Sequence, residues 1–356
     1  MHSIDEIPVV LTVFNRADCV ARLVDALRGA KPKRIFVLAD APRHDHPDDA
    51  EACRRARAAL VAIDWPAELS WKIATTNLGC SGSTLQGLDW VFAQVAEAIV
   101  FDDDTVPAAD FFPWCAAMLA RYRDAPDIRY VGGRNHLGAW PSGDADHILV
   151  RRGSLWGWAT WARAWTAFRA TDLKAAARPP TGLHPDPLVA QHLALMHDMV
   201  RGGQSLSWDL TWSLAAALAG QYAVLPPANL IANIGFGSGA LHTTFAGDFR
   251  GALPTGTTTP GPPGPRPLPD PLFDRWALLI ELLAAQRDSE VLLRLAKARH
   301  LVRDARLWLH LAPFDYAEDS VAALRHVAAF GTRSPHLDDI RARMEIVAQH
   351  QRRTAP

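Results

Sequence analysis

The sequence predicts an α/β fold with a mixed, mostly parallel sheet that is flanked by helices. Three observations lead to this prediction. Short apolar runs alternate along the chain with stretches whose apolar residues recur at helical spacing. The connections between them are short, as in parallel sheets that are covered by helices. Polar residues directly follow several of the apolar runs, at the carboxyl ends of strands where such folds bind ligands.

The first quarter of the chain alternates regularly between the two kinds of element. The expected order is strand 7–14, helix 20–27, strand 34–39, helix 48–63, strand 69–73 and helix 85–95. Asn15 and Arg16 follow the first strand, Asp40 follows the second, and Asn77 lies in the small-residue loop after the third. Because the carboxyl ends of parallel strands meet at one edge of a sheet, we expect these residues to converge in one crevice.

A fourth apolar run, residues 98–101, ends in three consecutive carboxylates: Asp102, Asp103 and Asp104. The run is too short for a helix and reads as a buried strand. Three adjacent acids repel one another unless a cation lies between them. Mg²⁺ and Mn²⁺ bind carboxylate oxygens together with phosphate oxygens, so the run predicts a metal–diphosphate site. The alternative is a solvated acidic turn in which Asp104 or Thr105 caps the following helix.

Several of the thirteen tryptophans cluster in the second half of the chain. The spacing of Trp158, Trp161 and Trp165 predicts a helix with these three side chains on one face. Aromatic faces suit the faces of pyranose rings, although core packing is the better interpretation for most tryptophans.

The segment that follows suggests a division of the chain. Residues 254–271 contain eight prolines with interspersed glycines, which is typical of a linker or of a flap that closes on a ligand. We therefore expect one domain over 1–252, a linker or flap over 253–271, and a helical C-terminal subdomain over 272–356. The helices of that subdomain could form an oligomer contact or lie on a membrane surface, but their alternating charges fit a solvated face equally well.

Composition excludes several classes of function. A net charge of −1 without a basic patch argues against nucleic-acid binding. Four scattered cysteines without CxxC spacing argue against a zinc site or a disulfide framework. The sequence has no signal peptide and no apolar run of the ~20 residues that span a membrane. We expect a cytoplasmic globular protein.

The order of the motifs resembles that of GT-A-fold glycosyltransferases. Residues 99–104 followed by Asp110–Phe111–Phe112 resemble the metal-binding motif of the N-acetylglucosaminyltransferase I-like and bacterial family 2-like nucleotide-diphospho-sugar transferases. Trp156–Gly157–Trp158 and Ser207–Trp208–Asp209 fall where that family has a glycine–tryptophan segment and a Trp–Asp motif. Residues 234–237 with His242 resemble the closing loop of bacterial relatives. The resemblance covers roughly residues 7–270, and Asp102 departs from it because the eukaryotic enzyme has Glu there.

The resemblance implies a role for each candidate residue. Asp104 would bind Mn²⁺ or Mg²⁺, and His242 would complete the metal shell or touch the diphosphate. Asp103 would contact the ribose, or the metal through water, and Asp102 would stabilise the loop or the nucleotide. Asp209 would be the general base that deprotonates the acceptor hydroxyl, in a partly apolar setting between Trp208 and Trp212. The remaining residues would bind the donor: Asn15, Arg16, Asp40, Asn77, Trp156 and Trp158. Structural alternatives stay open: helix caps for Asp40 and Asp209, a surface salt bridge for Arg16, and a structural role for His242.

The function expected from this resemblance is a metal-dependent, inverting glycosyltransferase of the hexosyl- or N-acetylhexosaminyltransferase class. It would move a sugar from a nucleotide-diphosphate sugar, with a UDP-sugar favoured, to a hydroxyl of a glycan or glycoconjugate, for example in polysaccharide biosynthesis. A nucleotidyltransferase would need a glycine-rich loop after the first strand, where this chain has Phe14–Asn15–Arg16. A non-catalytic nucleotide-sugar or glycan binder on a decayed transferase scaffold is the other alternative.

Overall fold

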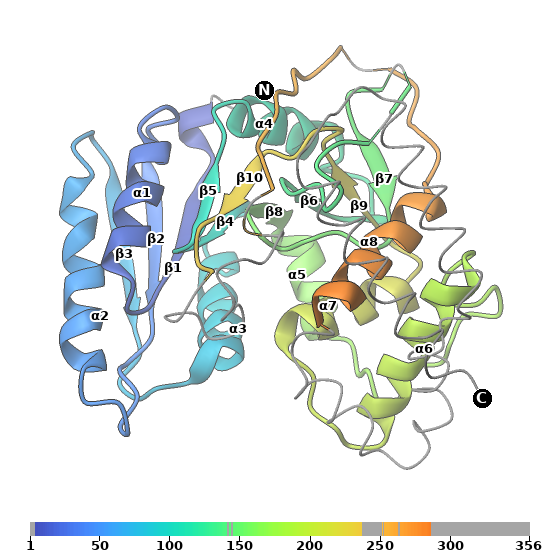
Figure 1. Cartoon of the computed structure of the whole chain (residues 1–356), viewed down its shortest axis with the longest axis horizontal. Helices are drawn as coiled ribbons and strands as arrows, with labels where there is room; N and C mark the ends of the chain where they lie inside the picture. Colours follow the sequence, from blue (N-terminus) through green and yellow to red (C-terminus); the bar gives the residue numbers. More distant parts are fainter. Residues whose placement is uncertain are drawn as a thin grey trace, which may run out of the picture.

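The computed structural model of the chain describes residues 4–140, 142–143, 145–236, 251, 253–262 and 264–285. Its centre is an eight-stranded sheet in the order β3-β2-β1-β4-β8-β6-β9-β7, with helices on both faces (Figure 1). Six strands run in one direction, whereas β8 and β7 run in the other. The predicted fold class, a mixed and mostly parallel sheet flanked by helices, is confirmed.

The strands of the main sheet are, in its spatial order, β3 (Glu68–Ile73), β2 (Arg34–Ala39), β1 (Val9–Val13), β4 (Glu97–Asp102), β8 (Trp158–Trp161), β6 (Ile128–Gly132), β9 (Tyr222–Leu225) and β7 (Ile148–Val150). A second, two-stranded sheet joins β5 (Thr105–Pro107) to β10 (Ile231–Asn233). The α-helices are α1 (Ala17–Leu27), α2 (Asp49–Ala58), α3 (Gly79–Phe92), α4 (Phe111–Arg121), α5 (Ala162–Arg169), α6 (Pro187–Arg201), α7 (Trp208–Leu218) and α8 (Pro271–Ala285). Two 3₁₀ turns, η1 (Ile4–Glu6) and η2 (Ala59–Ala62), complete the described elements.

Each face of the sheet has its own apolar core, because successive side chains of a strand point to opposite faces. Leu11, Val37 and Phe101 belong to one core, which includes residues of α1 and α4. Val10 and Val100 belong to the other, which includes residues of α3, α5 and α7. The runs predicted as buried strands are therefore buried on both faces, as expected for a doubly covered sheet.

The helix predicted over residues 156–165 is wrong in its first half. Trp158–Trp161 form strand β8, and helix α5 starts only at Ala162. β8 pairs antiparallel with β4 on one side and with β6 on the other, so its backbone groups are satisfied in the sheet. Trp158 and Trp161 therefore enter opposite cores, although their spacing also matches a helical face.

A short strand follows the three acids where the sequence suggested only a turn. β5 pairs antiparallel with β10, with Thr105 opposite Asn233. One residue later the Ile234 N–H donates to the Asp104 carbonyl at 2.9 Å. These hydrogen bonds place residues 233 and 234 directly beside the acidic run.

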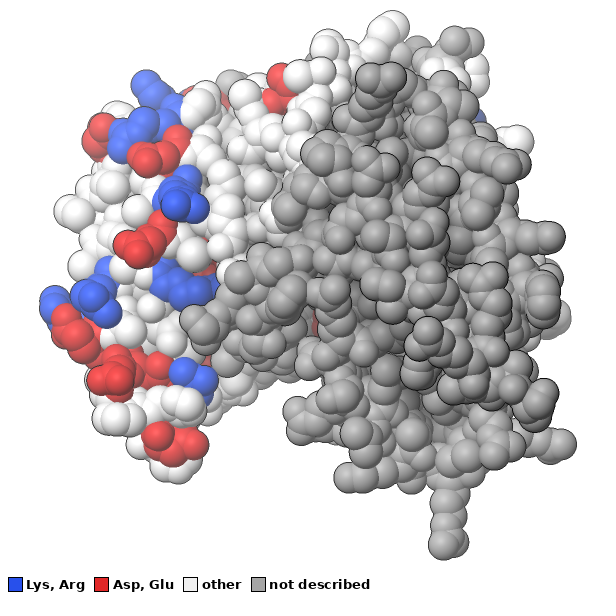
Figure 2. Space-filling model, viewed as in Figure 1, with Lys and Arg blue, Asp and Glu red and all other residues white. Residues whose placement is uncertain are grey.

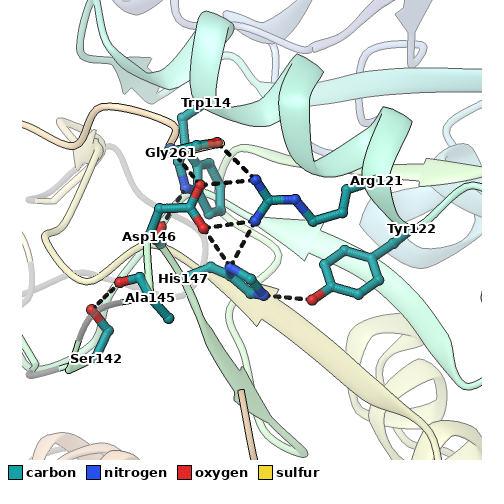
Figure 3. Close-up of polar contacts among 8 residues, drawn as sticks. All are labelled: Trp114, Arg121, Tyr122, Ser142, Ala145, Asp146, His147 and Gly261. Atoms are coloured by element: carbon teal, nitrogen blue, oxygen red, sulfur yellow. Dashed lines mark hydrogen bonds and ion pairs between the residues drawn. The ribbon is translucent and has the colours of Figure 1, made fainter. Parts of the chain in front are cut away.

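The proline-rich segment is bonded to the domain along its described length. The Gly256 N–H donates to the Asn229 carbonyl at 2.7 Å, and the Thr258 N–H donates to the Asp110 carboxylate at 3.1 Å. Asp146 holds the next part (Figure 3): its carboxylate accepts from the Gly261 N–H at 2.6 Å and from Arg121 at 2.7 Å, while Arg121 also donates to the Gly261 carbonyl at 2.9 Å. We call Arg121, Asp146 and Gly261 the clasp.

A buried pair of rings lies beside the clasp. The Asp146 carboxylate also bonds His147 Nδ1 at 2.7 Å, and His147 Nε2 contacts the Tyr122 hydroxyl (Figure 3). Burial lowers the pKa of His147 and raises that of Tyr122. His147 is therefore neutral at pH 7 and carries its proton on one nitrogen only. Its Nδ1 atom also lies 3.3 Å from the Arg121 guanidinium, so it contacts both members of the Arg121–Asp146 pair (Figure 3).

Helix α8 packs into the cores of the preceding domain. Phe273 and Ala277 are fully buried in the core that contains α3, α5 and α7, and Leu278 is buried against α6 and α7. Asp274 accepts hydrogen bonds from the backbone of Arg151 and Arg152 and from His184. The predicted domain boundaries stay predictions, because the helices expected after α8 lie outside the described residues.

Among the described helices, none is long and apolar enough to cross a membrane. In the face shown in Figure 2, basic and acidic side chains of the described part are interspersed rather than gathered into a field of one sign. The cytoplasmic location and an oligomer contact through the C-terminal helices stay predictions.

Candidate functional site

Asp102 ends β4 beside the end of β1. It lies opposite Thr12 in the parallel ladder, and the Thr12 hydroxyl donates to its carboxylate at 2.6 Å. Burial and the neighbouring charge of Asp104 raise the pKa of Asp102 to about 7, against the opposing effect of the Thr12 hydrogen bond. The protein therefore holds this carboxyl group close to its titration point at neutral pH.

Asp103 is turned toward the loop after β1. Its carboxylate accepts from the Phe14 N–H at 3.3 Å and forms an ion pair with Arg16. Burial raises the pKa of Asp103 to about 6, although the charge of Arg16 acts in the opposite direction. A single cation is thus not enough to offset the burial of these adjacent carboxylates.

Arg16 bridges two of the three acids. Its guanidinium pairs with Asp103 and, at 2.8 Å, with Asp104. Burial alone would lower the pKa of Arg16, but the two carboxylates raise it above its ordinary value. The surface salt bridge considered for Arg16 is in fact a contact inside the acidic site.

Gly235 closes the site on the side of β10. A Cβ atom added there would overlap the Asp104 carboxylate and lie 2.5 Å from Arg16 Nη1. The backbone at 235 therefore approaches the acids more closely than any side chain would allow.

The donor set fits a hard divalent cation that is completed by phosphate oxygens. Such ions are commonly bound through one or two carboxylates together with substrate phosphates and water. Asp104 and Asp103 offer carboxylate oxygens, and the Arg16 contact shows that a cationic group is accommodated between them. In the described part of the chain no group of three or more His, Cys, Asp or Glu side chains could hold a metal by protein ligands alone. His242 lies outside the described residues.

Asp40 and Asn77 are hydrogen-bonded to each other rather than to the acidic run 102–104. Asp40 accepts from the backbone N–H groups of Ala41 at 2.8 Å and Leu78 at 3.0 Å, and from the Asn77 amide at 3.2 Å. The same Asn77 amide donates to the Ala41 carbonyl at 2.7 Å. Asp40 thereby holds the residue before α3 against the end of β2, although no side chain caps the start of α3. A pocket of about 230 Å³ adjoins this junction, lined by residues of β2, the end of β3, the 74–78 loop and α3.

Asn15 is also hydrogen-bonded to a neighbouring element rather than to the acidic run. Its amide donates to Asp49 at 2.9 Å, and Asp49 pairs with Arg43 at 2.6 Å. The hydrogen bonds from Arg43 are the largest cause of the lowered pKa of Asp49. The structure therefore brings Arg16 to the acids, whereas Asn15 joins the loop after β1 to the start of α2.

Asp209 lies at the start of α7, which is hydrogen-bonded to the start of α3. It lies in the first turn of α7 with an exposed side chain, and the preceding Trp208 N–H donates to the Ser81 hydroxyl at 3.2 Å. Cys80 lies in the first turn of α3, and its pKa is raised to about 12, first by desolvation and then by the charges of Asp102, Asp209 and Asp104. Asp209 and the acidic run are thus both near enough to this thiol to affect its charge.

The apolar setting expected around Asp209 is absent from the described structure, because both flanking rings turn away from it. Trp208 and Trp212 are buried in an aromatic cluster with Trp158 and Trp165. Trp158 is only 1% exposed, so its faces are covered by protein and leave no room for a sugar ring. Trp156 is partly buried, with the Arg134 guanidinium 4.1 Å from its ring centre and the Phe236 ring at 5.8 Å.

Sequence reasoning missed the roles of Thr12, Cys80 and Ser81. Thr12 is the residue before the last of β1 and looks like an ordinary strand residue, and the contacts of Cys80 and Ser81 depend on how α7 packs on α3. Gly235 lies in the 234–237 segment that the resemblance had singled out, but its close approach to Asp104 was not predicted.

Comparisons with known proteins do not assign a family. No family model matches the sequence, and no curated protein matches it. Among solved structures, the mannosyltransferase PcManGT from Pyrobaculum calidifontis, in complex with GDP-Man and Mn²⁺, is matched over 97% of this chain and 80% of its own. The identity is 13% and the TM-score 0.35, values too low to support an assignment.

Proposed function

We propose that the protein is a metal-dependent glycosyltransferase that uses a nucleotide-diphosphate sugar, with a UDP-sugar favoured. The observation that carries the proposal is the acidic run at the end of β4, bridged by Arg16, with the exposed Asp209 on a helix that is hydrogen-bonded to the nearby start of α3. A donor held by its diphosphate at the acids would place its sugar toward Asp209. The resemblance of the ordered motifs supports the same conclusion.

In this proposal Asp104, with His242, holds Mn²⁺ or Mg²⁺ against the donor diphosphate. A divalent cation there supplies the charge that stabilises the leaving diphosphate. Arg16 leaves its bridge between Asp103 and Asp104 and pairs with a phosphate oxygen, for which its planar guanidinium is well suited. Asp103 is then free to accept a hydrogen bond from the ribose, and Asp102 stays fixed by Thr12.

Asp209 acts as the general base. Its carboxylate takes the proton of the acceptor hydroxyl while that oxygen attacks the anomeric carbon from the face opposite the diphosphate, so the configuration inverts. Its exposure suits this step, because an acceptor glycan must reach the carboxylate from solvent. Trp156 offers a partly open ring for a sugar, whereas Trp158 contributes packing alone.

The direct test is release of nucleoside diphosphate from a panel of nucleotide sugars in the presence of Mn²⁺ and glycan acceptors. We expect one donor to be turned over by the wild-type protein, with Asp209→Asn losing transfer but retaining donor binding. Asp104→Asn should lose both. Asp198→Asn, which alters an exposed acid on α6, serves as the matched control. Turnover that survives in Asp209→Asn would refute the assignment of the base.

A further inference from the structure

Among the described residues, nothing pairs with the outer edge of β3. β3 is the terminal strand of the sheet and pairs only with β2 within the described part of the chain. The Glu68 N–H donates to the carbonyl of Lys33, directly before β2, at 2.7 Å, and the Ala74 N–H donates to Ala39 at 2.9 Å. Because alternate residues of a parallel strand bond to the same neighbour, the N–H and C=O groups of Leu69, Trp71 and Ile73 point outward.

Apolar side chains accompany this free edge. Trp71 is 39% exposed and Ile73 is 53% exposed, and both are large hydrophobic residues on the same face of β3. The neighbouring helices pack further in, α3 against β2 and α2 against β1. A strand edge with exposed apolar side chains is a template for pairing with another strand.

We propose that a second copy of this chain pairs with this edge, β3 against β3 in antiparallel orientation, about a two-fold axis at Ser70. Such a contact uses the same surface of both copies, as two-fold dimers do. The bonded pairs must come from residues 69, 71 and 73, which allows an axis at residue 70, 71 or 72. The three registers place different side chains opposite one another, and this distinguishes them.

Only the axis at Ser70 matches charge with charge. It places Glu68 opposite the partner's Lys72, and by symmetry this ion pair occurs twice. On the other face of the strand it places Leu69 opposite the partner's Trp71. An axis at residue 71 leaves both charges opposite uncharged residues, and an axis at residue 72 sets two lysines against each other. Opposite charges and aromatic–aliphatic pairs directly across an antiparallel ladder are favourable, whereas like charges are unfavourable.

The charged side chains of β3 also suit pairing with a second copy of the chain. Lysine on an edge strand usually discourages pairing, but here Glu68 of the partner subunit would neutralise it. Lys72 already lies over the Trp90 ring of α3, 6.0 Å from its centre, so its side chain is held near the sheet surface. Glu68 is exposed and therefore accessible to a partner. A second copy thus supplies both the complementary charge and the apolar cover.

Sedimentation equilibrium of the full chain tests the proposal independently of any enzymatic activity. The wild-type protein should be a reversible dimer. Glu68→Lys should raise the dissociation constant roughly tenfold or more, because two favourable pairs become two like-charge contacts. The double variant Glu68→Lys/Lys72→Glu should restore the wild-type constant to within about threefold. Glu51→Lys, an exposed acid on α2, is the matched control.

Trp71→Glu provides a second measurement, since it should also break the dimer while circular dichroism confirms that the variant is folded. A wild-type protein that stays monomeric at high concentration would overturn the proposal. So would a dimer that tolerates both Glu68→Lys and Trp71→Glu. Failure of the double charge reversal to restore the dimer would overturn the register at Ser70.

Discussion

Replacing Asp102 by Asn should make the metal-free protein more stable at neutral and alkaline pH. The substitution removes a negative charge and keeps an oxygen that can accept from Thr12. The pKa of Asp102 rises from 3.8 to about 7 in the folded protein, first through burial and then through Asp104. The folded state therefore binds this proton more tightly than the unfolded state, and stability falls as the pH rises from about 4 through about 7. The full loss is at most about 4 kcal/mol.

Urea denaturation in the presence of a chelator, at pH 5 and pH 8, measures this effect. Between these two values the wild-type protein should lose roughly 2–3 kcal/mol more stability than Asp102→Asn. Groups remote from Asp102 titrate equally in both proteins and cancel in the difference. Asp45→Asn, which alters an exposed loop acid, should behave like the wild type. Parallel pH profiles for Asp102→Asn and the wild type would refute the reasoning that the site stores unfavourable charge for a cation.

Three further predictions follow from particular contacts. Gly235→Ala places a methyl group on the Asp104 carboxylate and should abolish Mn²⁺-dependent nucleotide binding measured by calorimetry. Gly264→Ala, whose added Cβ would meet only the Pro262 carbonyl in ordinary contact at 3.9 Å, should bind normally. Phe273→Ala removes a fully buried ring from α8 and should lower the free energy of unfolding, measured with denaturant, by about 3–5 kcal/mol. Leu272→Ala alters a half-exposed side chain and should lower it little. Equal effects of the two variants would mean that α8 is not part of the core. Asp146→Ala breaks the clasp and should open residues 253–262 to limited proteolysis, a result contradicted by cleavage no faster than in the wild type.

The parallel half of the fold was predictable because its signals are local. The apolar runs that became β1, β2 and β4 are short, rich in β-branched residues and followed by polar ones, so both their type and their shared edge could be inferred. β8 could not, because the spacing of its tryptophans satisfies a helical and an extended interpretation equally. Only the antiparallel insertion between β4 and β6 decides between them.

The charged residues at the centre of the candidate site could be predicted from the sequence, but the contact partners of the other candidate residues could not. Three adjacent acids indicate a cation site, because their charges repel one another. Arg16 contacts two of them, as expected for residues at the ends of neighbouring strands. Asp40 and Asn15 also follow strands, but Asp40 is hydrogen-bonded to the residue before α3 and Asn15 to the start of α2. Which partner each residue finds depends on the geometry of the connecting loops. The burial of Trp158 depends on packing between β8 and α7, which no local pattern reports.

Calorimetric titration of UDP, GDP and CDP, each with Mn²⁺ and with a chelator, tests the central claim most directly. The account predicts that UDP binds when Mn²⁺ is present, that chelation abolishes binding, and that Asp104→Asn removes it without unfolding the protein. Failure of all three nucleotides to bind in either condition, or binding that is indifferent to both the metal and Asp104, would contradict it.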